Sequence, residues 1–146
     1  MMKKVFFLSL FLLLNCSRDD NSQETFSIVS TWKITKGEVR DLSTNQITSS
    51  TPSGCQSQDT HEFQTNKVIS THYHLSNNNC IGDEIVIINY TLDLKNNKFW
   101  YEGEEKYPYL ISKLASNELI LIDKYGDSND DGIVDDYKTL YFTRVR

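Results

Sequence analysis

The sequence lacks an apolar run long enough to cross a bilayer as a helix. Its longest apolar stretch, Val5–Leu14, is broken only by Ser9 and falls well short of the roughly 20 residues that a membrane-spanning helix needs. Lys3 and Lys4 precede it, and a positive segment followed by a short apolar segment is typical of a cleavable export signal. We therefore predict that residues 1–15 are a signal peptide, in preference to an N-terminal core helix.

A lipidation motif follows the apolar run. Leu13-Leu14-Asn15-Cys16 resembles the bacterial lipobox, in which a leucine stands three positions before an obligatory cysteine, although Asn15 replaces the usual small residue. The resemblance implies that Cys16 becomes lipidated after cleavage, and two or more acyl chains hold a protein stably at a membrane. We therefore expect a lipid-anchored protein of the cell envelope, in the outer membrane, facing the periplasm or exposed on the surface.

Residues 16–27 have the composition of a flexible tether, because the stretch SRDDNSQET after Cys16 is polar and has no periodicity. It resembles the segment after the lipidated cysteine in lipoproteins of Bacteroidetes-type bacteria, where a serine and a short acidic run direct export to the surface. Residues 28–146 remain for one domain of ordinary size.

The chain also lacks an excess of positive charge. It has 15 lysines and arginines against 20 aspartates and glutamates, a net charge of −5 that becomes −7 when Lys3 and Lys4 leave with the signal. Nucleic acids and anionic lipid headgroups are bound chiefly through lysine and arginine, so we expect neither as a partner. The expected partners are the membrane, through the anchor, and a small ligand, and the expected state is a monomer.

Motifs of the common enzyme classes are missing. The sequence has no nucleophile elbow, phosphate-binding loop, zinc-protease helix motif or dinucleotide fingerprint. We therefore predict a protein that is not an enzyme, although carboxylates scattered around a barrel mouth would leave no local signature.

Cysteine is scarce, with three residues in the chain. Once Cys16 is assigned to the lipid, Cys55 and Cys80 remain in a compartment where disulfides persist. We predict that these two pair, which in the chain-entropy model is worth roughly 3 to 4 kcal/mol. The alternative, a mixed cysteine and histidine metal site, has little support, because there is no C-x-x-C and because His72 and His74 lie along a predicted strand.

Helical periodicity is absent, and β-type segments separated by Asn, Gly and Ser turns fill the domain. The predicted strands span residues 28–40, 58–65, 67–75, 84–94, 98–104, 107–114, 118–125 and 136–145. Short links such as Gln64–Lys67 and Lys95–Asn97 join antiparallel neighbours. Eight such strands either pack as two sheets or close into a barrel, and closure removes exposed edges. We predict an all-β fold, an eight-stranded antiparallel up-and-down meander closed into a barrel.

The domain resembles the small lipocalin-like lipoproteins of Bacteroidetes from about Ile28 to Arg146. The residues that carry the resemblance are Ser30-Thr31-Trp32-Lys33, Cys55, Asp59, Glu62-Phe63, Cys80 and Tyr141-Phe142-Thr143-Arg144. The resemblance implies a lipocalin-like barrel in which Trp32 packs across the closed end with Arg144 over its ring, a structural contact worth about 0.5 to 2 kcal/mol.

An eight-stranded barrel is just wide enough to be filled by side chains or to hold one small ligand. Aromatic residues make up 12% of the chain and gather at Phe99, Trp100, Tyr101, Tyr107 and Tyr109, where the inward-facing ones either contact a ligand or fill the interior. We predict binding of a small hydrophobic or amphipathic ligand. The alternative is a non-catalytic interaction or envelope module with a filled barrel.

An acidic segment between the last two predicted strands has the spacing of a calcium loop. Oxygen ligands at alternate positions, with Gly132 at the sixth, resemble the D-x-N-x-D-G loops of dockerins and EF-hands. The predicted ligands are Asp127, Asn129, Asp131, the Ile133 carbonyl and Asp135. Lys138 stands where a bidentate acid is expected. The alternative is a solvated acidic hairpin loop, so calcium is a predicted cofactor with the role of clamping this loop.

Overall fold

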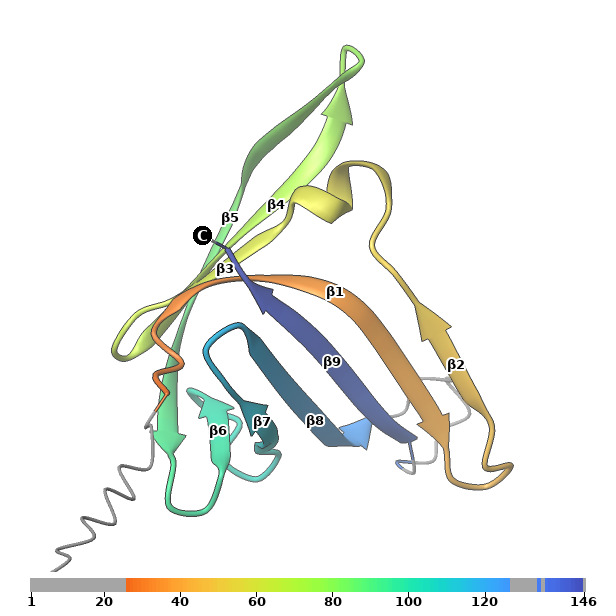
Figure 1. The fold of residues 1–146 in the computed structure, drawn as a ribbon, viewed down its shortest axis with the longest axis vertical. Helices are drawn as coiled ribbons and strands as arrows, with labels where there is room; N and C mark the ends of the chain where they lie inside the picture. The colour runs from red at the N-terminus through yellow and green to blue at the C-terminus, as the bar shows by residue number, and fades with distance from the viewer. Residues whose placement is uncertain (1–25, 127–133, 135, 146) are drawn as a thin grey trace, which may run out of the picture.

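The computed structural model describes residues 26–126, 134 and 136–145 (Figure 1). Within these residues the chain forms nine strands and one short 3-10 helix. The elements are β1 (Ser30–Asp41), β2 (Ile47–Ser50), η1 (Gly54–Gln58), β3 (Thr60–Phe63), β4 (Lys67–Ser76), β5 (Asn79–Asp93), β6 (Lys98–Tyr101), β7 (Tyr109–Leu114), β8 (Glu118–Gly126) and β9 (Asp136–Arg144).

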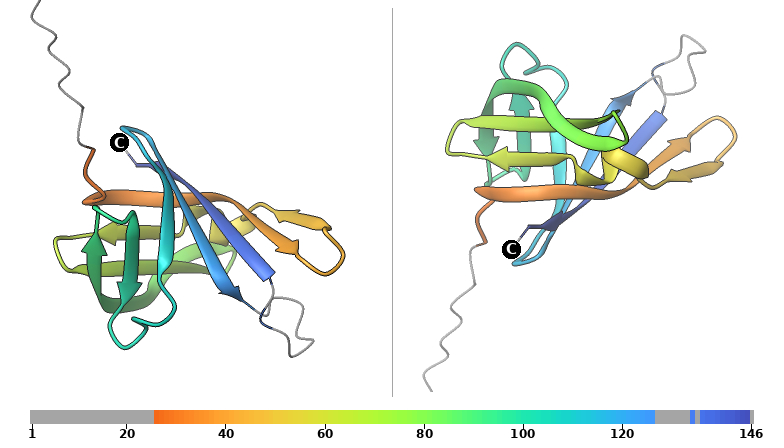
Figure 2. Two further views of the ribbon diagram at one scale, coloured as in Figure 1. Left: turned by 90° about the horizontal axis from the view of Figure 1, so that it is seen from below. Right: turned by 90° about the horizontal axis from the view of Figure 1, so that it is seen from above.

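Eight of the strands form a closed antiparallel barrel, which confirms the predicted fold class. β1 pairs with β3 through Ser30–Trp32 and with β9 through Trp32–Asp41, so the ring runs β1, β3, β4, β5, β6, β7, β8, β9 and back to β1. Figure 2 shows β1 lying between the β3–β4–β5 side and the β8–β9 side. Tight turns make the antiparallel order possible: Asn97 takes a left-handed φ of 53°, as expected for the hairpin between β5 and β6.

The strand predictions miss β2, which lies outside the ring. It pairs with the C-terminal half of β1, from Gly37 opposite Ser50 to Arg40 opposite Ile47. All of its residues are exposed, so it has no buried face and lacks the alternation of apolar and polar residues by which a strand is found from sequence.

The start of β5 is also earlier than predicted, at Asn79 and not at residue 84. Asn77 and Asn78, with φ of 49° and 61°, turn β4 directly into β5, and Ser76 pairs with Asn79. The result is a long β4–β5 hairpin that extends beyond the rest of the barrel, as Figure 1 shows.

The core fills one part of the barrel with large side chains. It consists of Ile28, Trp32, Phe63, Val68, Tyr90, Phe99, Ile111, Leu119, Leu121 and Phe142. Phe99 lies at its aromatic centre: the ring of Tyr109 stacks on it at 4.9 Å, and those of Tyr90 and Phe63 meet it edge to face at 6.1 Å. This part of the interior is therefore filled.

The closed end of the barrel has the arrangement that the resemblance implied. The Trp32 ring is fully buried, and its Nε1 donates a hydrogen bond of 2.8 Å to the Ile28 carbonyl. The guanidinium of Arg144 lies 4.6 Å from the ring centroid, and its Nη2 donates to the Ser27 carbonyl at 2.9 Å. The first and last strands of the ring are thus joined through side chains as well as backbone.

Candidate ligand-binding site

A cavity of about 330 Å³ lies between the β1–β9 side of the barrel and the β3–β4 side. The segment from β2 to η1 forms one part of its wall. The lining residues are Ile34 and Gly37 of β1, Ser50, Thr51, Pro52, Gln56 and Asp59 of the segment from β2 to β3, His61, His72, and Lys138 and Leu140 of β9. Apolar side chains and titratable groups therefore meet in one space.

The strand pairing explains why the two histidines share this cavity. His61 lies two residues before the core residue Phe63, so both point into the barrel, and the His61 ring meets the ring of Phe142 edge to face at 5.8 Å. His61 pairs with Ser70 on β4, which places His72 one inward position further along. The centroids of the two imidazole rings are 6.0 Å apart.

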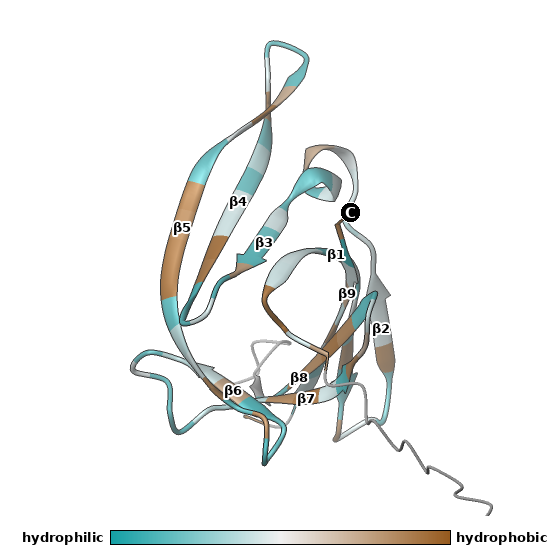
Figure 3. Cartoon of the chain, turned by 60° about the vertical axis from the view of Figure 1, so that its left-hand side comes forward, coloured by the Kyte–Doolittle hydropathy of each residue, from teal (hydrophilic) through white to brown (hydrophobic). Residues whose placement is uncertain are grey.

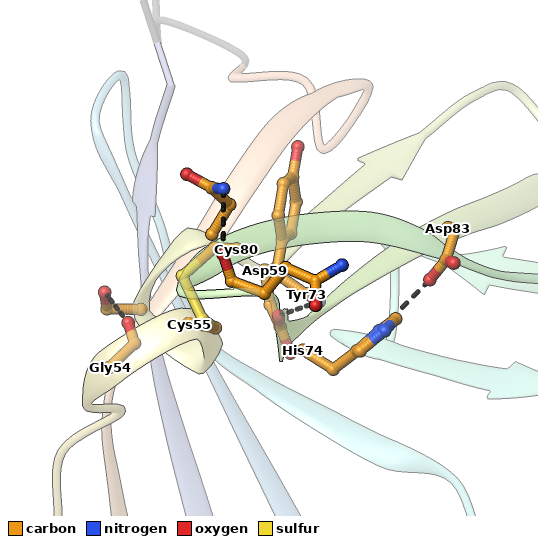
Figure 4. Close-up of a disulfide and its surroundings, with 10 residues drawn as sticks. Gly54, Cys55, Asp59, Tyr73, His74, Cys80 and Asp83 are labelled. Carbon is orange, nitrogen blue, oxygen red and sulfur yellow. Dashed lines mark hydrogen bonds and ion pairs between the residues drawn. A yellow bond between two sulfur atoms is a disulfide. The ribbon is translucent and has the colours of Figure 1, made fainter.

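Hydrogen bonds hold this polar wall in place. Asp59 accepts a bond of 2.8 Å from the Tyr73 backbone N–H through Oδ1, and its Oδ2 lies 2.9 Å from Nδ1 of His72. Nδ1 of His61 is bonded to the Ser70 hydroxyl at 2.8 Å. Figure 4 shows Asp59 and Tyr73 beside the disulfide. Each of the two rings therefore has one nitrogen engaged, which fixes its orientation toward the cavity.

Burial lowers the pKa of His61, and the neighbouring His72 lowers that pKa further, while the Asp59 carboxylate opposes both effects. At neutral pH His61 is therefore an uncharged imidazole. It supplies a hydrogen-bonding surface and no net charge.

The opposite wall comes from pairing between the two ends of the ring. β1 and β9 are antiparallel, with Gly37 opposite Leu140 and Val39 opposite Lys138. Ile34 and Leu140 give this wall an apolar surface, and Lys138 adds an ammonium group. The site can therefore hold an apolar group against one wall and a polar or anionic group near Lys138.

The predicted disulfide is confirmed: Cys55 and Cys80 are joined, with a Cα–Cα distance of 5.2 Å (Figure 4). The bond ties η1 to the start of β5 and so fastens the cavity wall to the β4–β5 hairpin. His74 is not among the residues that line the cavity with His72. Its Nδ1 lies 3.1 Å from Oδ1 of Asp83. Among the residues that the structure describes, no group of three or more His, Cys, Asp or Glu could hold a metal ion.

Several predicted residues lie outside the described part of the chain. They are Cys16 and the tether up to residue 25, and the calcium-loop residues Asp127, Asn129, Asp131, Ile133 and Asp135. The lipid anchor and the calcium site stay predictions. In the described residues no helix has the length and apolar character needed to cross a membrane.

Asp59 and His72 stand out in the sequence separately, and no sequence pattern brings them together with His61. The signal that could have found the site is the break in apolar alternation along two paired strands, where His61, Ser70 and His72 take inward positions next to Phe63 and Val68. Polar groups at inward positions mark either a hydrogen-bonded core or a cavity.

Comparisons with known proteins identify no family for this chain. No family model and no curated protein matches the chain. Among solved structures, an uncharacterized protein from Bacteroides eggerthii DSM 20697 is similar with a TM-score of 0.47 and 11% identity, over 82% of this chain and 100% of that one. A likeness of this degree carries no argument about function.

Proposed function

We propose that this protein binds a small amphipathic ligand in the cavity between β1, β3, β4 and β9, as a non-catalytic domain anchored to the outer membrane through Cys16. The observation that carries the proposal is the size and lining of the cavity. Its volume of about 330 Å³ falls at the lower end of small-molecule sites, which run from about 300 to 1,000 Å³.

The chemistry of the walls indicates the class of ligand. Ile34 and Leu140 would contact an apolar group, while Lys138 and His72 lie where a carboxylate or another anionic headgroup could be held. Asp59 is already engaged by His72 and by the Tyr73 amide, so its charge is partly offset. A compact amphiphile with an anionic head matches this site best.

One observation favours the alternative of a filled barrel that acts as an interaction module. The aromatic residues Tyr101 and Tyr109 pack against Phe99, at 5.4 and 4.9 Å between ring centroids. The aromatic side of the barrel interior is therefore packed with side chains, and the cavity lies on the side formed by β1, β3, β4 and β9.

Titration with anilinonaphthalene sulfonate, a fluorescent amphipathic anion, tests the proposal. Ser50 lines the cavity, whereas Ser49 lies next to it on the same exposed strand and donates to Glu38 outside the cavity. We expect saturable one-to-one binding that Ser50→Trp weakens at least about tenfold, a change of about 1.4 kcal/mol, and that Ser49→Trp leaves unchanged. Equal binding by both variants would contradict this site.

Native mass spectrometry of the full chain, purified from its own envelope, separates the two functions. A co-purifying small molecule, displaced in Ser50→Trp, supports the carrier. Absence of any such molecule together with no saturable binding of the probe favours the interaction module.

The anchor has its own test. Cys16→Ser removes the thiol that the lipobox resemblance assigns to the lipid, so we expect the chain to move from the membrane fraction to the soluble fraction. Unchanged fractionation, measured by immunoblot after centrifugation, would contradict lipidation at Cys16.

A further inference from the structure

The strand β5 has an unpaired edge along most of its length. From Asn79 to Asn89 it pairs with β4 on one side, but β6 pairs only with Tyr90–Asp93 on the other. No strand in the part of the chain that the structure describes covers the edge from Asn79 to Ile88, and at Asn89 the backbone N–H of Glu102 already donates to the carbonyl on that side. Figure 3 shows a hydrophobic band of β5 along this outer part of the barrel.

This edge is apolar and accessible. The exposed fractions are 60% for Ile85, 36% for Val86, 59% for Ile87 and 38% for Ile88. Proteins usually protect such an edge with lysine, proline, a bulge or a very short strand. The segment Glu84–Asn89 contains neither lysine nor proline and pairs with β4 in an unbroken register, so its backbone is open to a further strand.

The direction of the backbone groups can be read from the flanking hydrogen bonds. The Tyr90 N–H donates to Asn66 on the β4 side at 2.8 Å, and the Asn89 carbonyl accepts from Glu102 on the other side at 3.0 Å. Because successive residues of a strand alternate in direction, the N–H and C=O groups of Ile85 and Ile87 point to the open edge. These are the groups that a partner strand would engage.

We propose that β5 pairs antiparallel with β5 of a second copy of this chain, about a two-fold axis at Val86. In this register Ile85 lies opposite the second copy's Ile87, in a hydrogen-bonded pair, and Val86 lies opposite its own counterpart. The sheet then continues from β4 and β5 of one copy into β5 and β4 of the other. In this proposal, the monomer expected from the sequence is the species that forms when the dimer dissociates.

Charge favours this antiparallel arrangement over parallel pairing. The two-fold register puts Glu84 opposite Ile88, whereas parallel pairing in register would set each acid against its own copy, which is destabilising. An axis at Ile87 would push the second copy against Tyr90, which already pairs with β6.

The chain's own N-terminal segment is a poor occupant of the edge. The stretch from Ser17 to Thr25 is polar and acidic and offers no apolar side chains to face Ile85 and Ile87. A second copy matches the edge in both polarity and length, because the same surface serves on both subunits of a two-fold dimer.

Cysteine cross-linking in the full chain, expressed with its own N-terminal segment, tests the register. Residues facing each other in a non-hydrogen-bonded pair have Cα atoms about 4.5 Å apart, within the range of a disulfide. Val86→Cys is expected to give a reducible dimer on a non-reducing gel, at least about tenfold more than Ile88→Cys, whose position faces Glu84. Equal cross-linking at the two positions would overturn the register.

Sedimentation of the full chain in detergent tests the dimer itself. Val86→Lys sets two ammonium groups against each other at the axis and is expected to weaken the dimer at least about tenfold. Leu75→Lys, on an apolar residue 67% exposed near the hairpin tip, is expected to leave it intact. A wild-type chain that stays monomeric at about 100 μM, or a Val86→Cys adduct with a different polypeptide, would overturn the proposal.

Discussion

At the scale of single residues, we expect the contact between Arg144 and Trp32 to stabilise the folded barrel. The guanidinium lies 4.6 Å from the ring centroid of a fully buried indole and also donates to the Ser27 carbonyl. We expect Arg144→Leu to lower the free energy of unfolding by about 2 kcal/mol, because a partly desolvated cation–π contact and a charged hydrogen bond are lost together. Urea denaturation measures this loss.

A matched control is available on the surface. Lys124 is exposed and lies 5.3 Å from the centroid of the Tyr137 ring, so Lys124→Leu should cost less than about 1 kcal/mol. Similar losses for the two variants would show that burial at the closed end adds nothing to the Arg144 contact.

His61 gives stability a dependence on pH. Its pKa in the folded protein lies below the ordinary value of 6.5, chiefly because of burial, so the unfolded chain binds more protons in the window between the two values. The part of the free energy of unfolding that depends on uncharged His61 is therefore fully present above pH 6.5 and is lost as the pH falls below that value. We expect the melting temperature of the wild type to fall more steeply between pH 7 and 5 than that of His61→Gln, as measured by circular dichroism.

The result that would contradict this interpretation is a steeper fall in the variant. His61 titrating above its ordinary range by NMR would contradict it as well, because a raised pKa reverses the sign of the effect.

At the scale of elements, the β4–β5 hairpin depends on a glycine beneath an aromatic ring. Gly82 pairs with Tyr73, and a Cβ added at Gly82 would lie 2.6 Å from the ring. We expect Gly82→Ala to lower the free energy of unfolding by about 1 to 3 kcal/mol, the usual cost of overpacking. In a Tyr73→Ala background the same change should cost much less, and chemical denaturation of the four variants measures the coupling.

Most of these elements can be predicted from the sequence because their signal is local. β4, β7, β8 and β9 show β-branched or aromatic residues between turn residues, and the turn at Asn97 has the residue type that a left-handed φ requires. β2 and the first part of β5 were missed, because neither has a buried face. Exposed strands are set by the neighbour they pair with, which a local pattern does not contain.

The residues that line the cavity could be predicted only in part, for the same reason. The inward position of His61 follows from alternation along β3, but Leu140 and Lys138 reach the cavity through pairing with β1, about 100 residues earlier in the chain. Register between distant strands is decided by the whole barrel. The disulfide was predictable because only Cys55 and Cys80 remain once Cys16 is assigned to the predicted lipid anchor, and two cysteines allow a single intramolecular pairing.

At the scale of the whole molecule, stability is unevenly distributed. β2 is exposed at every residue and pairs only with β1, whereas β9 lies in the closed ring between β1 and β8. We expect the amides of β2 to exchange with solvent at least about 100-fold faster than those of β9, since opening β2 exposes little buried surface. Hydrogen exchange measured by NMR checks this ratio, and equal rates would contradict it.

The pairing of β1 with β9 has a consequence for how the chain is made. Nine residue pairs join these strands, from Trp32 opposite Arg144 to Asp41 opposite Asp136. A polypeptide that emerges from a ribosome or a translocation pore with its N-terminus first has β1 available well before β9. The barrel therefore closes only after β9 has emerged, and until then the Trp32 indole lacks the cover that Arg144 gives it and is open to chaperones.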